Sequence, residues 1–214
     1  MKISFAILCY DEAQSLHEIL SLLLVERPYE YEIIIVQDGN HQPTTEMLKG
    51  YYEQCNLVNG YRRFLNNDFS AQKNYMTEKC SGDWVFNLDS DELPPEYLLE
   101  NIHLIIEQND AEVLWLPRIN IINGLTQEWA KRLQINVNEL GWVNYPDFQQ
   151  RIYKNDYPRI HWERPVHERI VGFKTHAFLP TDIDKAEHLA MKHVKTIQKQ
   201  VEQNQKYAKI MGVI

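Results

Sequence analysis

The first half of the chain alternates between continuous apolar runs and apolar residues at helical spacing. Leucine and isoleucine recur at i, i+3, i+4, i+7 and i+8 over residues 16–24, which predicts an amphipathic helix. Helices are also expected over residues 43–54 and 71–79, the latter with Ser70 as its N-cap. The apolar runs at residues 3–9, 33–36 and 84–88 are short enough for strands buried on both faces, and residues 57–64 give a weaker signal for a further strand. This order predicts an α/β fold with a mainly parallel sheet flanked by helices.

The second half has a less regular pattern. A helix with an apolar face follows Pro94 and Pro95, and a strand is expected at residues 113–117. Beyond it the periodicity is poor, apart from a short helix expected around Trp129. The second half is therefore expected to be loop-rich.

Two segments near the carboxyl end carry clearer signals. Residues 150–153 and 159–162 read as a β-hairpin, and residues 183–211 as one helix rich in lysine and glutamine. We expect one domain over the whole chain, with a regular half over residues 1–110 and an antiparallel half over residues 111–214. A nucleotide-binding half followed by an acceptor-binding half would explain this division, as would a plain α/β domain with a covering subdomain.

Carboxylates follow several of the predicted strands. Asp89 and Asp91 are two residues apart at the end of the run 84–88, so on an extended segment they point the same way. Ligands of open α/β sheets bind at this edge, and two carboxylates there suit Mg²⁺ or Mn²⁺. A polar Asp-Ser-Asp turn is the alternative. Asp38 stands beside Gly39 after the second run, and Asp11, after the first, is equally well explained as a helix cap.

Composition narrows the classes of function. The chain has 214 residues, of which 44% are hydrophobic and 24% charged, and a net charge of −8. An acidic protein of this kind is not expected to bind nucleic acid non-specifically, because phosphate contacts need a basic face. Three cysteines without metal or disulfide spacing, no signal-peptide pattern and no apolar run of about 20 residues lead us to expect a soluble, cytoplasmic protein.

The motifs, taken in order, resemble glycosyltransferase family 2, which has the GT-A (Rossmann-like) fold. Residues 7–12 (Ile-Leu-Cys-Tyr-Asp-Glu) and 34–40 (Ile-Ile-Val-Gln-Asp-Gly-Asn) are similar to the family's first two strand ends, and residues 89–92 (Asp-Ser-Asp-Glu) to its Asp-x-Asp motif. Three later segments resemble the lipopolysaccharide-core-type bacterial subgroup of this family. They are residues 145–153, 165–168 (Pro-Val-His-Glu) and 193–196 (His-Val-Lys-Thr), with Gln200, Asn204 and Tyr207 beyond them. Asp11, Gln37 and Asn40 depart from the usual residues, where the family holds the base of its nucleotide.

The resemblance implies an inverting enzyme that moves a sugar from a nucleotide-sugar to an acceptor hydroxyl with Mn²⁺ or Mg²⁺. A UDP-sugar is the favoured donor, and a glycan or lipid-linked acceptor in cell-surface glycan synthesis is implied. The chain carries no expected transmembrane segment, and peripheral membrane association is a further expectation. Asp91 would be the first metal ligand, Asp89 would reach the ribose or the metal, and His193 would be the third ligand, with His188 as its local competitor.

The resemblance also implies nucleotide contacts and a base. Asp38, Asp11 and the backbone near Cys9 would border the nucleotide pocket, and Lys73 would lie near the donor. Inversion in one displacement needs one carboxylate on the acceptor side to take the hydroxyl proton. The two candidates are Glu168, in Pro-Val-His-Glu, and Asp147, which would otherwise cap a strand start; Glu92 and Glu163 are less favoured alternatives.

Other classes of protein share single features of this chain. A haloacid-dehalogenase-type phosphatase also places Asp-x-Asp after an apolar strand, but usually near the start of its domain. A nucleotidyltransferase would need a glycine-rich first loop, which residues 10–13 lack. A non-catalytic nucleotide-sugar or carbohydrate-binding protein is the remaining alternative, since several tryptophans could stack on sugar rings or simply fill the core. They are Trp115, Trp129, Trp142 and Trp162.

Overall fold

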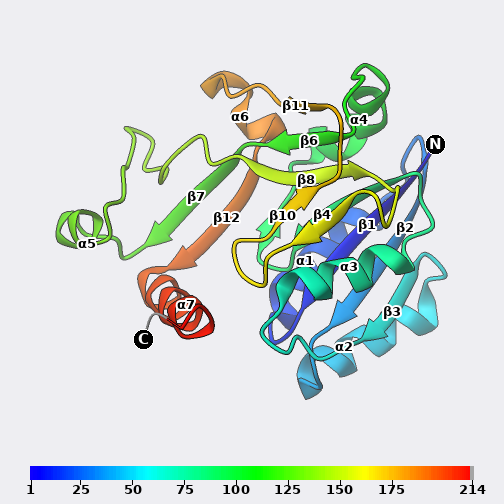
Figure 1. Cartoon of the computed structure of the whole chain (residues 1–214), viewed down its shortest axis with the longest axis horizontal. Helices are drawn as coiled ribbons and strands as arrows, with labels where there is room; N and C mark the ends of the chain where they lie inside the picture. Colours follow the sequence, from blue (N-terminus) through cyan, green and yellow to red (C-terminus); the bar gives the residue numbers. More distant parts are fainter. Residues whose placement is uncertain (213–214) are drawn as a thin grey trace.

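The computed structural model describes residues 1–212 and has one large sheet at its centre (Figure 1). The first half contains the predicted alternation, and its strands pair in parallel. Its elements are β1 (Lys2–Cys9), α1 (Ala13–Leu23), β2 (Glu30–Gln37), α2 (Gln42–Gln54), β3 (Val58–Arg62), α3 (Phe69–Lys79) and β4 (Trp84–Asp89). Continuous burial along β1, β2 and β4 explains their unbroken apolar runs, because helices cover both faces of such a sheet. The prediction of an α/β fold is confirmed.

Strands from both halves of the chain form the seven-stranded sheet, in the order β11-β6-β8-β4-β1-β2-β3. From the second half come β6 (Val113–Leu116), β8 (Gln149–Lys154) and β11 (His176–Phe178). Strand β8 runs antiparallel to both of its neighbours, β4 and β6. The sheet thus joins the two expected halves, whose separate roles stay a prediction.

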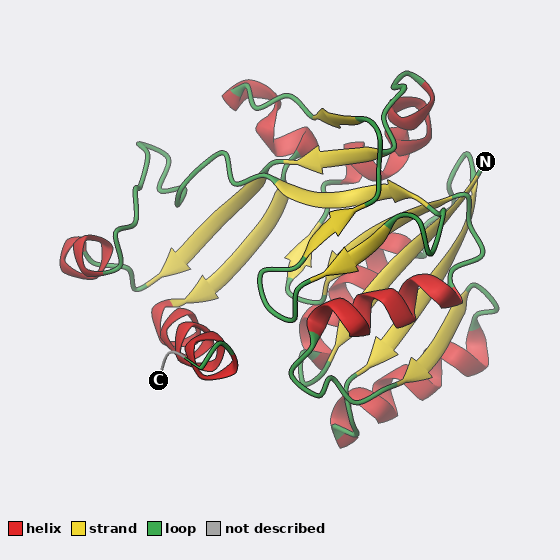
Figure 2. Cartoon of the chain, viewed as in Figure 1, coloured by secondary structure: helices red, strands yellow, loops and turns green. Residues whose placement is uncertain are grey.

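Other elements pack on both faces of this sheet (Figure 2), and an apolar cluster lies on each face. One face packs against α1, α2 and α4 (Glu96–Glu107). The other packs against α3 and against a two-stranded hairpin of β9 (His161–Glu163) and β10 (Arg169–Val171). A smaller sheet of β5 (Glu92–Leu93), β12 (Met191–Thr196) and β7 (Arg118–Asn123) extends away from the core.

The expected hairpin at residues 150–162 is wrong. Residues 150–153 form the middle of β8, where all four are buried, as they must be in a strand with neighbours on both sides. Residues 161–163 pair instead with β10, farther along the chain. In the sequence, the polar residues Gln150 and Arg151 make this buried strand look like an exposed strand of a hairpin. Their side chains bind partners elsewhere in the chain, and the sequence pattern does not reveal those partners.

The single helix expected at residues 183–211 is also wrong. This segment contains α6 (Ile183–Leu189), β12 and α7 (Ile197–Ile210). Within β12, Met191 and His193 are buried while Lys192 and Val194 are exposed, which is the period of two of a strand. Thr196 ends the strand and caps α7 by accepting a hydrogen bond from the Lys199 backbone nitrogen at 3.2 Å.

Smaller elements agree more closely with the sequence. The short helix expected around Trp129 is α5 (Gln127–Arg132). Helix α3 begins at Phe69, and its cap is Asp68, whose Oδ1 accepts from the Ala71 nitrogen at 2.9 Å, so the prediction of Ser70 as the cap is wrong. Over the described residues, no helix has the length and hydrophobicity needed to cross a bilayer.

Candidate active site

The end of β4 delivers the two carboxylates of the Asp-Ser-Asp turn to a group of charged side chains. Arg151 Nη2 lies 2.6 Å from Asp89 Oδ2, and Lys73 Nζ lies 3.8 Å from Asp89 Oδ1. The same Lys73 Nζ lies 2.6 Å from Glu168 Oε1. Lys73, from α3, and Glu168, just before β10, thus face the end of β4 together. We call the whole group the charged cluster; it comprises Lys73, Asp89, Asp91, Glu92, Arg118, Asp147, Arg151, Glu168 and His193.

A β-bulge in β8 brings Arg151 into this cluster. In the pairing with β6, Ile152 lies opposite Leu114 and Gln150 opposite Trp115, so Arg151 is the extra residue. A bulge re-aims the side chain of its extra residue. Arg151 is 2% exposed, and its Nη2 lies 2.6 Å from Glu92 Oε2 as well as from Asp89. Arg151 therefore clamps the turn at the end of β4 from the inside of the sheet.

A second arginine holds the outer side of the cluster. Arg118, on β7, places Nη1 2.5 Å from Glu92 Oε1 and Nη2 2.6 Å from Asp147 Oδ2. Asp147 also accepts from Asn120 Nδ2 at 2.8 Å and from Gln149 Nε2 at 2.8 Å. The two oxygens of Asp147 are therefore occupied by donors from the protein itself.

The small sheet places His193 beside Asp91. In that sheet His193 is paired with Glu92 on one side and with Asn120 on the other. Asn120 donates its amide N–H to Asp147, so its Oδ1 faces His193 Nδ1, 2.9 Å away. Since this oxygen can only accept, Nδ1 carries a proton. The other ring nitrogen, Nε2, lies 3.3 Å from Asp91 Oδ2.

Electrostatics keep the carboxylates of the Asp-Ser-Asp turn ionised. Burial alone would raise the pKa of Asp89, but the charges of Arg151 and Lys73 outweigh it and hold the pKa far below its usual value. Partial desolvation likewise opposes ionisation of Asp91, whose side chain is 51% exposed, but the hydrogen bond and charge of His193 outweigh it, so this pKa is also lowered. Two ionised carboxylates at one strand end can attract a cation.

The expected nucleotide-binding residues lie at the ends of β1 and β2. Cys9 is buried, which raises the pKa of its thiol to about 12, and its carbonyl accepts from the Asp38 backbone nitrogen at 2.8 Å. Asp38 Oδ1 accepts from the Leu65 nitrogen at 2.8 Å and so fixes the chain after β3. Asp11 is exposed. Glu12, which the sequence did not single out, accepts from Ser90 Oγ at 3.0 Å and links this region to the Asp-Ser-Asp turn.

Helix α7 directly follows β12 and packs its Tyr207 against residues next to the cluster. The ring of Tyr207 lies 6.2 Å from Phe69 and 5.4 Å from His167, in both cases edge to face. Burial raises the pKa of Tyr207, the hydrogen bond with Gln203 opposes this rise, and the charges of Glu168, Asp89 and Asp91 add to it. Tyr207 therefore faces the cluster, whereas His188 is exposed on α6 and packs its ring 5.4 Å from Tyr97.

Comparison with known proteins identifies the family of this chain. The sequence pattern that defines the family described as Glycosyl transferase family 2 matches residues 4–170 of the chain. The matched segment contains both carboxylates of the Asp-Ser-Asp turn and also Glu168. This chain belongs to glycosyltransferase family 2.

Individual relatives are distant. An uncharacterized glycosyltransferase of Mycoplasma pneumoniae is 26% identical over 149 residues, which is 67% of this chain and 48% of that protein. The undecaprenyl-phosphate 4-deoxy-4-formamido-L-arabinose transferase of Pseudomonas fluorescens is 30% identical over 141 residues, or 61% of this chain and 39% of that protein. The chain thus spans less than half the length of these two family 2 relatives.

A solved structure shows the same fold. The crystal structure of Staphylococcus aureus TarS with UDP-GlcNAc matches with a TM-score of 0.63 at 16% identity, over 91% of this chain and 59% of that one. At this identity the likeness extends to the fold, and it supports the GT-A architecture expected for a family 2 member.

The structure also adds residues to the site. Arg151 and Arg118, which the sequence did not assign to it, each form an ion pair with Glu92, and Asn120 supports His193. One signal was available: Arg151 stands in an otherwise buried strand, where a charged side chain needs a partner. Nothing in the sequence indicates which partner that is.

Proposed function

We propose that this chain transfers a sugar from a nucleotide-sugar donor, with a UDP-sugar favoured, to a hydroxyl group of a glycan or lipid-linked acceptor, with inversion at the anomeric carbon. One observation carries the proposal: Asp91 and His193 meet at the end of β4, while Glu168 faces the same strand end across Lys73. The names of the relatives support the donor and acceptor classes, since TarS was crystallised with UDP-GlcNAc and another relative acts with undecaprenyl phosphate. Membership in the lipopolysaccharide-core-type subgroup stays a prediction.

The residues present fit a divalent cation. Asp91 offers a carboxylate, and His193 offers Nε2, whose partner nitrogen is already held by Asn120, as metal-binding histidines usually require. Within residues 1–212, no group of three or more histidine, cysteine or acidic side chains is arranged to hold a metal by itself. Mn²⁺ and Mg²⁺ are often bound by one or two side chains together with substrate phosphates. A cation held here would offset the charge that develops on the diphosphate as it leaves.

The donor nucleotide belongs at the ends of β1 and β2. Asp38 uses Oδ1 to hold Leu65, and its other oxygen remains for the N–H of a base. Asp11 and the backbone near Cys9 border the same edge of the sheet, and Asp89 reaches the ribose or the cation. Lys73 lies 4.4 Å from the centre of the Trp162 ring and between two carboxylates, so its ammonium group is fixed beside the donor position.

Glu168 is the better candidate for the base. Among the described residues it makes one ion pair, to Lys73, so one carboxylate oxygen is left for an acceptor hydroxyl. Asp147 already accepts from Arg118, Asn120 and Gln149. We therefore assign proton removal to Glu168, and to Asp147 the task of orienting Asn120 and, through it, His193. The hydroxyl proton passes to Glu168 as the new C–O bond forms and the bond to the diphosphate breaks.

Calorimetry of UDP binding, with and without Mn²⁺, tests the donor site. Wild-type protein should bind UDP more tightly when Mn²⁺ is present, and Asp91→Ala should lose about ten-fold or more of that affinity. Asp110→Ala is the matched control, because Asp110 is exposed at the end of α4, away from the site. Equal binding by Asp91→Ala and wild type would remove Asp91 from the donor site.

The alternative classes give different results. A phosphatase of the haloacid-dehalogenase type would use Asp89 as a nucleophile, but both Asp89 oxygens face cations of the protein, and the family match speaks against that class. Hydrolysis of p-nitrophenyl phosphate would indicate it. A non-catalytic binding protein would bind UDP and Mn²⁺ without ever releasing UDP from a UDP-sugar. A cytoplasmic location and association with a membrane surface stay predictions, to be read from cell fractionation.

A further inference from the structure

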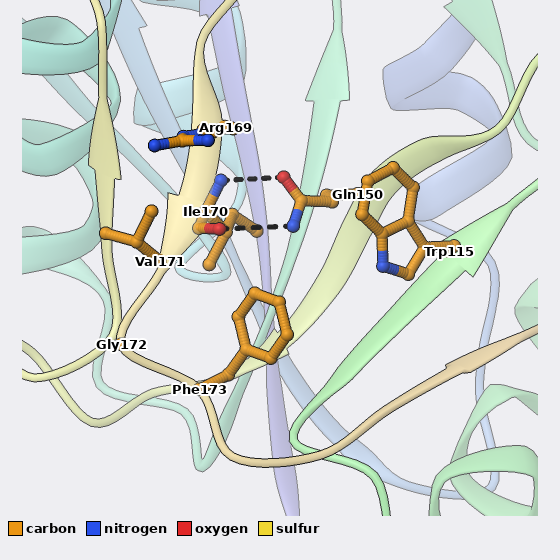
Figure 3. A pocket seen from close by; sticks show the side chains of 7 residues that line it. All are labelled: Trp115, Gln150, Arg169, Ile170, Val171, Gly172 and Phe173. Carbon is orange, nitrogen blue, oxygen red and sulfur yellow. Dashed lines mark hydrogen bonds between the residues drawn. The ribbon is translucent and has the colours of Figure 1, made fainter.

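A pocket of about 460 Å³ lies between β6, β8 and β10 (Figure 3). Its volume falls within the range of roughly 300–1,000 Å³ that is common for small-molecule sites. The proposed function does not use it. The residues that line it are Trp115, Gln150, Arg169, Ile170, Val171, Gly172 and Phe173.

The walls of this pocket are fixed by hydrogen bonds. The Gln150 side chain accepts from the Ile170 nitrogen at 2.7 Å and donates to the Ile170 oxygen at 3.2 Å, much as a neighbouring strand would (Figure 3). Gly172 has a φ of +82°, and a Cβ there would collide with the carbonyl of Arg159. Arg159 in turn donates to the Gly172 oxygen at 2.9 Å. The pocket is therefore preformed, so a ligand would not have to order it.

Aromatic rings cover one side of the pocket and continue beyond it. Trp115 is stacked against Phe178, with centroids 5.4 Å apart and ring planes 26° apart. Phe148 packs edge-on against Phe178 at 4.8 Å, and Phe178 is 51% exposed. Phe173 lies across the pocket from Trp115 (Figure 3). A stacked, partly exposed aromatic surface suits a flat ligand with an apolar face.

The polar groups of the pocket indicate a neutral ligand that is rich in oxygen. Trp115 Nε1 is buried and has no hydrogen-bond partner among the described residues, and Figure 3 shows it turned to the side of the ring on which Phe173 lies. An unmet N–H donor favours an acceptor oxygen, which a hydrocarbon tail lacks. Arg169 at the rim lies 3.7 Å from Glu163, so its charge is already balanced and does not call for a phosphate. Sugar rings combine an apolar face of C–H groups with hydroxyl and ether oxygens.

The pocket and the charged cluster are built on the same two strands. Gln150 is followed directly by Arg151, and Arg169 is preceded directly by Glu168. We propose that this pocket binds a saccharide unit of the acceptor, adjacent to the unit whose hydroxyl group reacts. That this saccharide belongs to the acceptor rests on the proposed function, whereas saccharide binding itself rests on the pocket alone. The acceptor would then contain at least two sugar units.

A printed glycan array tests the inference with the full chain and without donor or metal, so failure of transferase activity cannot mask the result. Wild-type protein should bind oligosaccharides of two or more units. Trp115→Leu and Phe173→Ala should each weaken that binding about ten-fold or more, because each removes an aromatic wall. Trp129→Leu is the matched control: this tryptophan is half-buried on α5, outside the pocket, and the variant should bind as wild type does.

Two further arms keep the test decisive. Trp115→Phe preserves the ring and removes the N–H, so a well-folded Phe variant should bind more weakly than wild type and more tightly than the Leu variant. Thermal unfolding of each variant identifies any loss of fold. The inference is overturned if wild-type protein binds no glycan on the array, or if Trp115→Leu binds as wild type does. It is also overturned if binding to alkyl glycosides follows the length of the alkyl chain and ignores the sugar.

Discussion

Two regions of the same sheet edge hold their carboxylates in different ways. At the end of β2, Asp38 accepts from one backbone nitrogen, that of Leu65, and makes no ion pair among the described residues. At the end of β4, the carboxylates of the charged cluster are joined by arginine and lysine side chains into one network. The first region is stabilised by the local chain. The second depends on side chains from α3, β5, β7, β8 and β12.

The difference fits what each region has to bind. A nucleotide base needs a shaped edge with a few neutral contacts, which a backbone can provide. A cation and a departing diphosphate need opposing charges held in place before the reaction, since reorganising them during the reaction would cost free energy. The cluster meets this need with five carboxylates against three lysine and arginine side chains, an excess of negative charge that attracts a divalent cation.

Removing the central cation of the network should have the largest effect. Arg151→Met leaves Asp89 and Glu92 near each other without their shared partner. We expect the free energy of unfolding to fall by about 3–5 kcal/mol, the usual cost of breaking a buried ion pair. Urea unfolding measures this change. Arg132→Met, at an exposed position of α5, should change it by less than about 0.5 kcal/mol; equal losses in both variants would mean that the network is not buried in the sense described.

Removing the basic oxygen should affect turnover and leave the fold intact. Glu168→Gln keeps the shape of the side chain and removes its basicity, so we expect turnover to fall by about 10²-fold or more. Binding of UDP with Mn²⁺ should stay within two-fold by calorimetry. Glu163→Gln, on the same hairpin but exposed, serves as the control. If Asp147→Asn lowers turnover more than Glu168→Gln does while Mn²⁺ binding is preserved, the base is Asp147.

The role of His193 as a metal ligand can be tested by substituting Asn120, the residue that holds its Nδ1. Asn120→Ala removes the group that holds Nδ1, so affinity for Mn²⁺ in the presence of UDP should fall by about 10–100-fold. His193→Ala should lower it at least as much, and His188→Ala should not change it. Acidification should weaken Mn²⁺ binding by wild-type protein, because only the neutral imidazole binds a metal. A His188→Ala variant as weak as His193→Ala would refute the assignment.

The charged cluster should also affect how the free energy of unfolding depends on pH in acid. The pKa of Asp89 lies below its usual value of 3.8 in the folded protein, so the unfolded chain takes up this proton first as the pH falls. The stability that Asp89 contributes is therefore complete at neutral pH and is lost progressively below about pH 5. Asp89→Asn should flatten the decline in unfolding free energy between about pH 5 and pH 3. An unchanged slope would show that Asp89 titrates alike in both states.

The smallest effect is expected on the other side of the comparison. Asp38→Ala removes one hydrogen bond to the Leu65 nitrogen, which should cost about 1 kcal/mol of stability by urea unfolding. Affinity for Mn²⁺ in the presence of UDP should fall only by the amount that the contact between Asp38 and the nucleotide base contributes to UDP binding. If Asp38→Ala destabilises the protein as much as Arg151→Met, then the two regions are not held differently after all.

The strands of the first half could be predicted because their signal is local. Residues 3–9 and 84–88 are apolar except for Ser4 and Asn87, and their short length between turn residues favours buried strands. The secondary-structure predictions were wrong where tertiary contacts determine the secondary structure. Arg151 is polar yet buried, and residues 191–196 form a strand of six residues between two helices, too short to interrupt a helical pattern clearly.

The candidate site divides in the same way. The nearness of Asp91 and His193 followed from the resemblance to a known family, and the spacing of Asp89 and Asp91 from the geometry of a strand. Arg151 could not be placed, because its position depends on a bulge whose partner strand lies about 35 residues earlier in the chain. Asn120 could not be placed either, since its role exists only once β7 and β12 are paired.

The position of β8 has a consequence for how the protein folds. Strand β8 lies between β4 and β6, although it is made after both of them. Until residue 154 has left the ribosome, β4 has β1 on one side and an open edge on the other. Open apolar edges of this kind pair readily with other chains. The nascent chain must therefore protect β4 while some sixty residues are still being added, and a fragment that ends before residue 149 should aggregate, whereas the full chain should not.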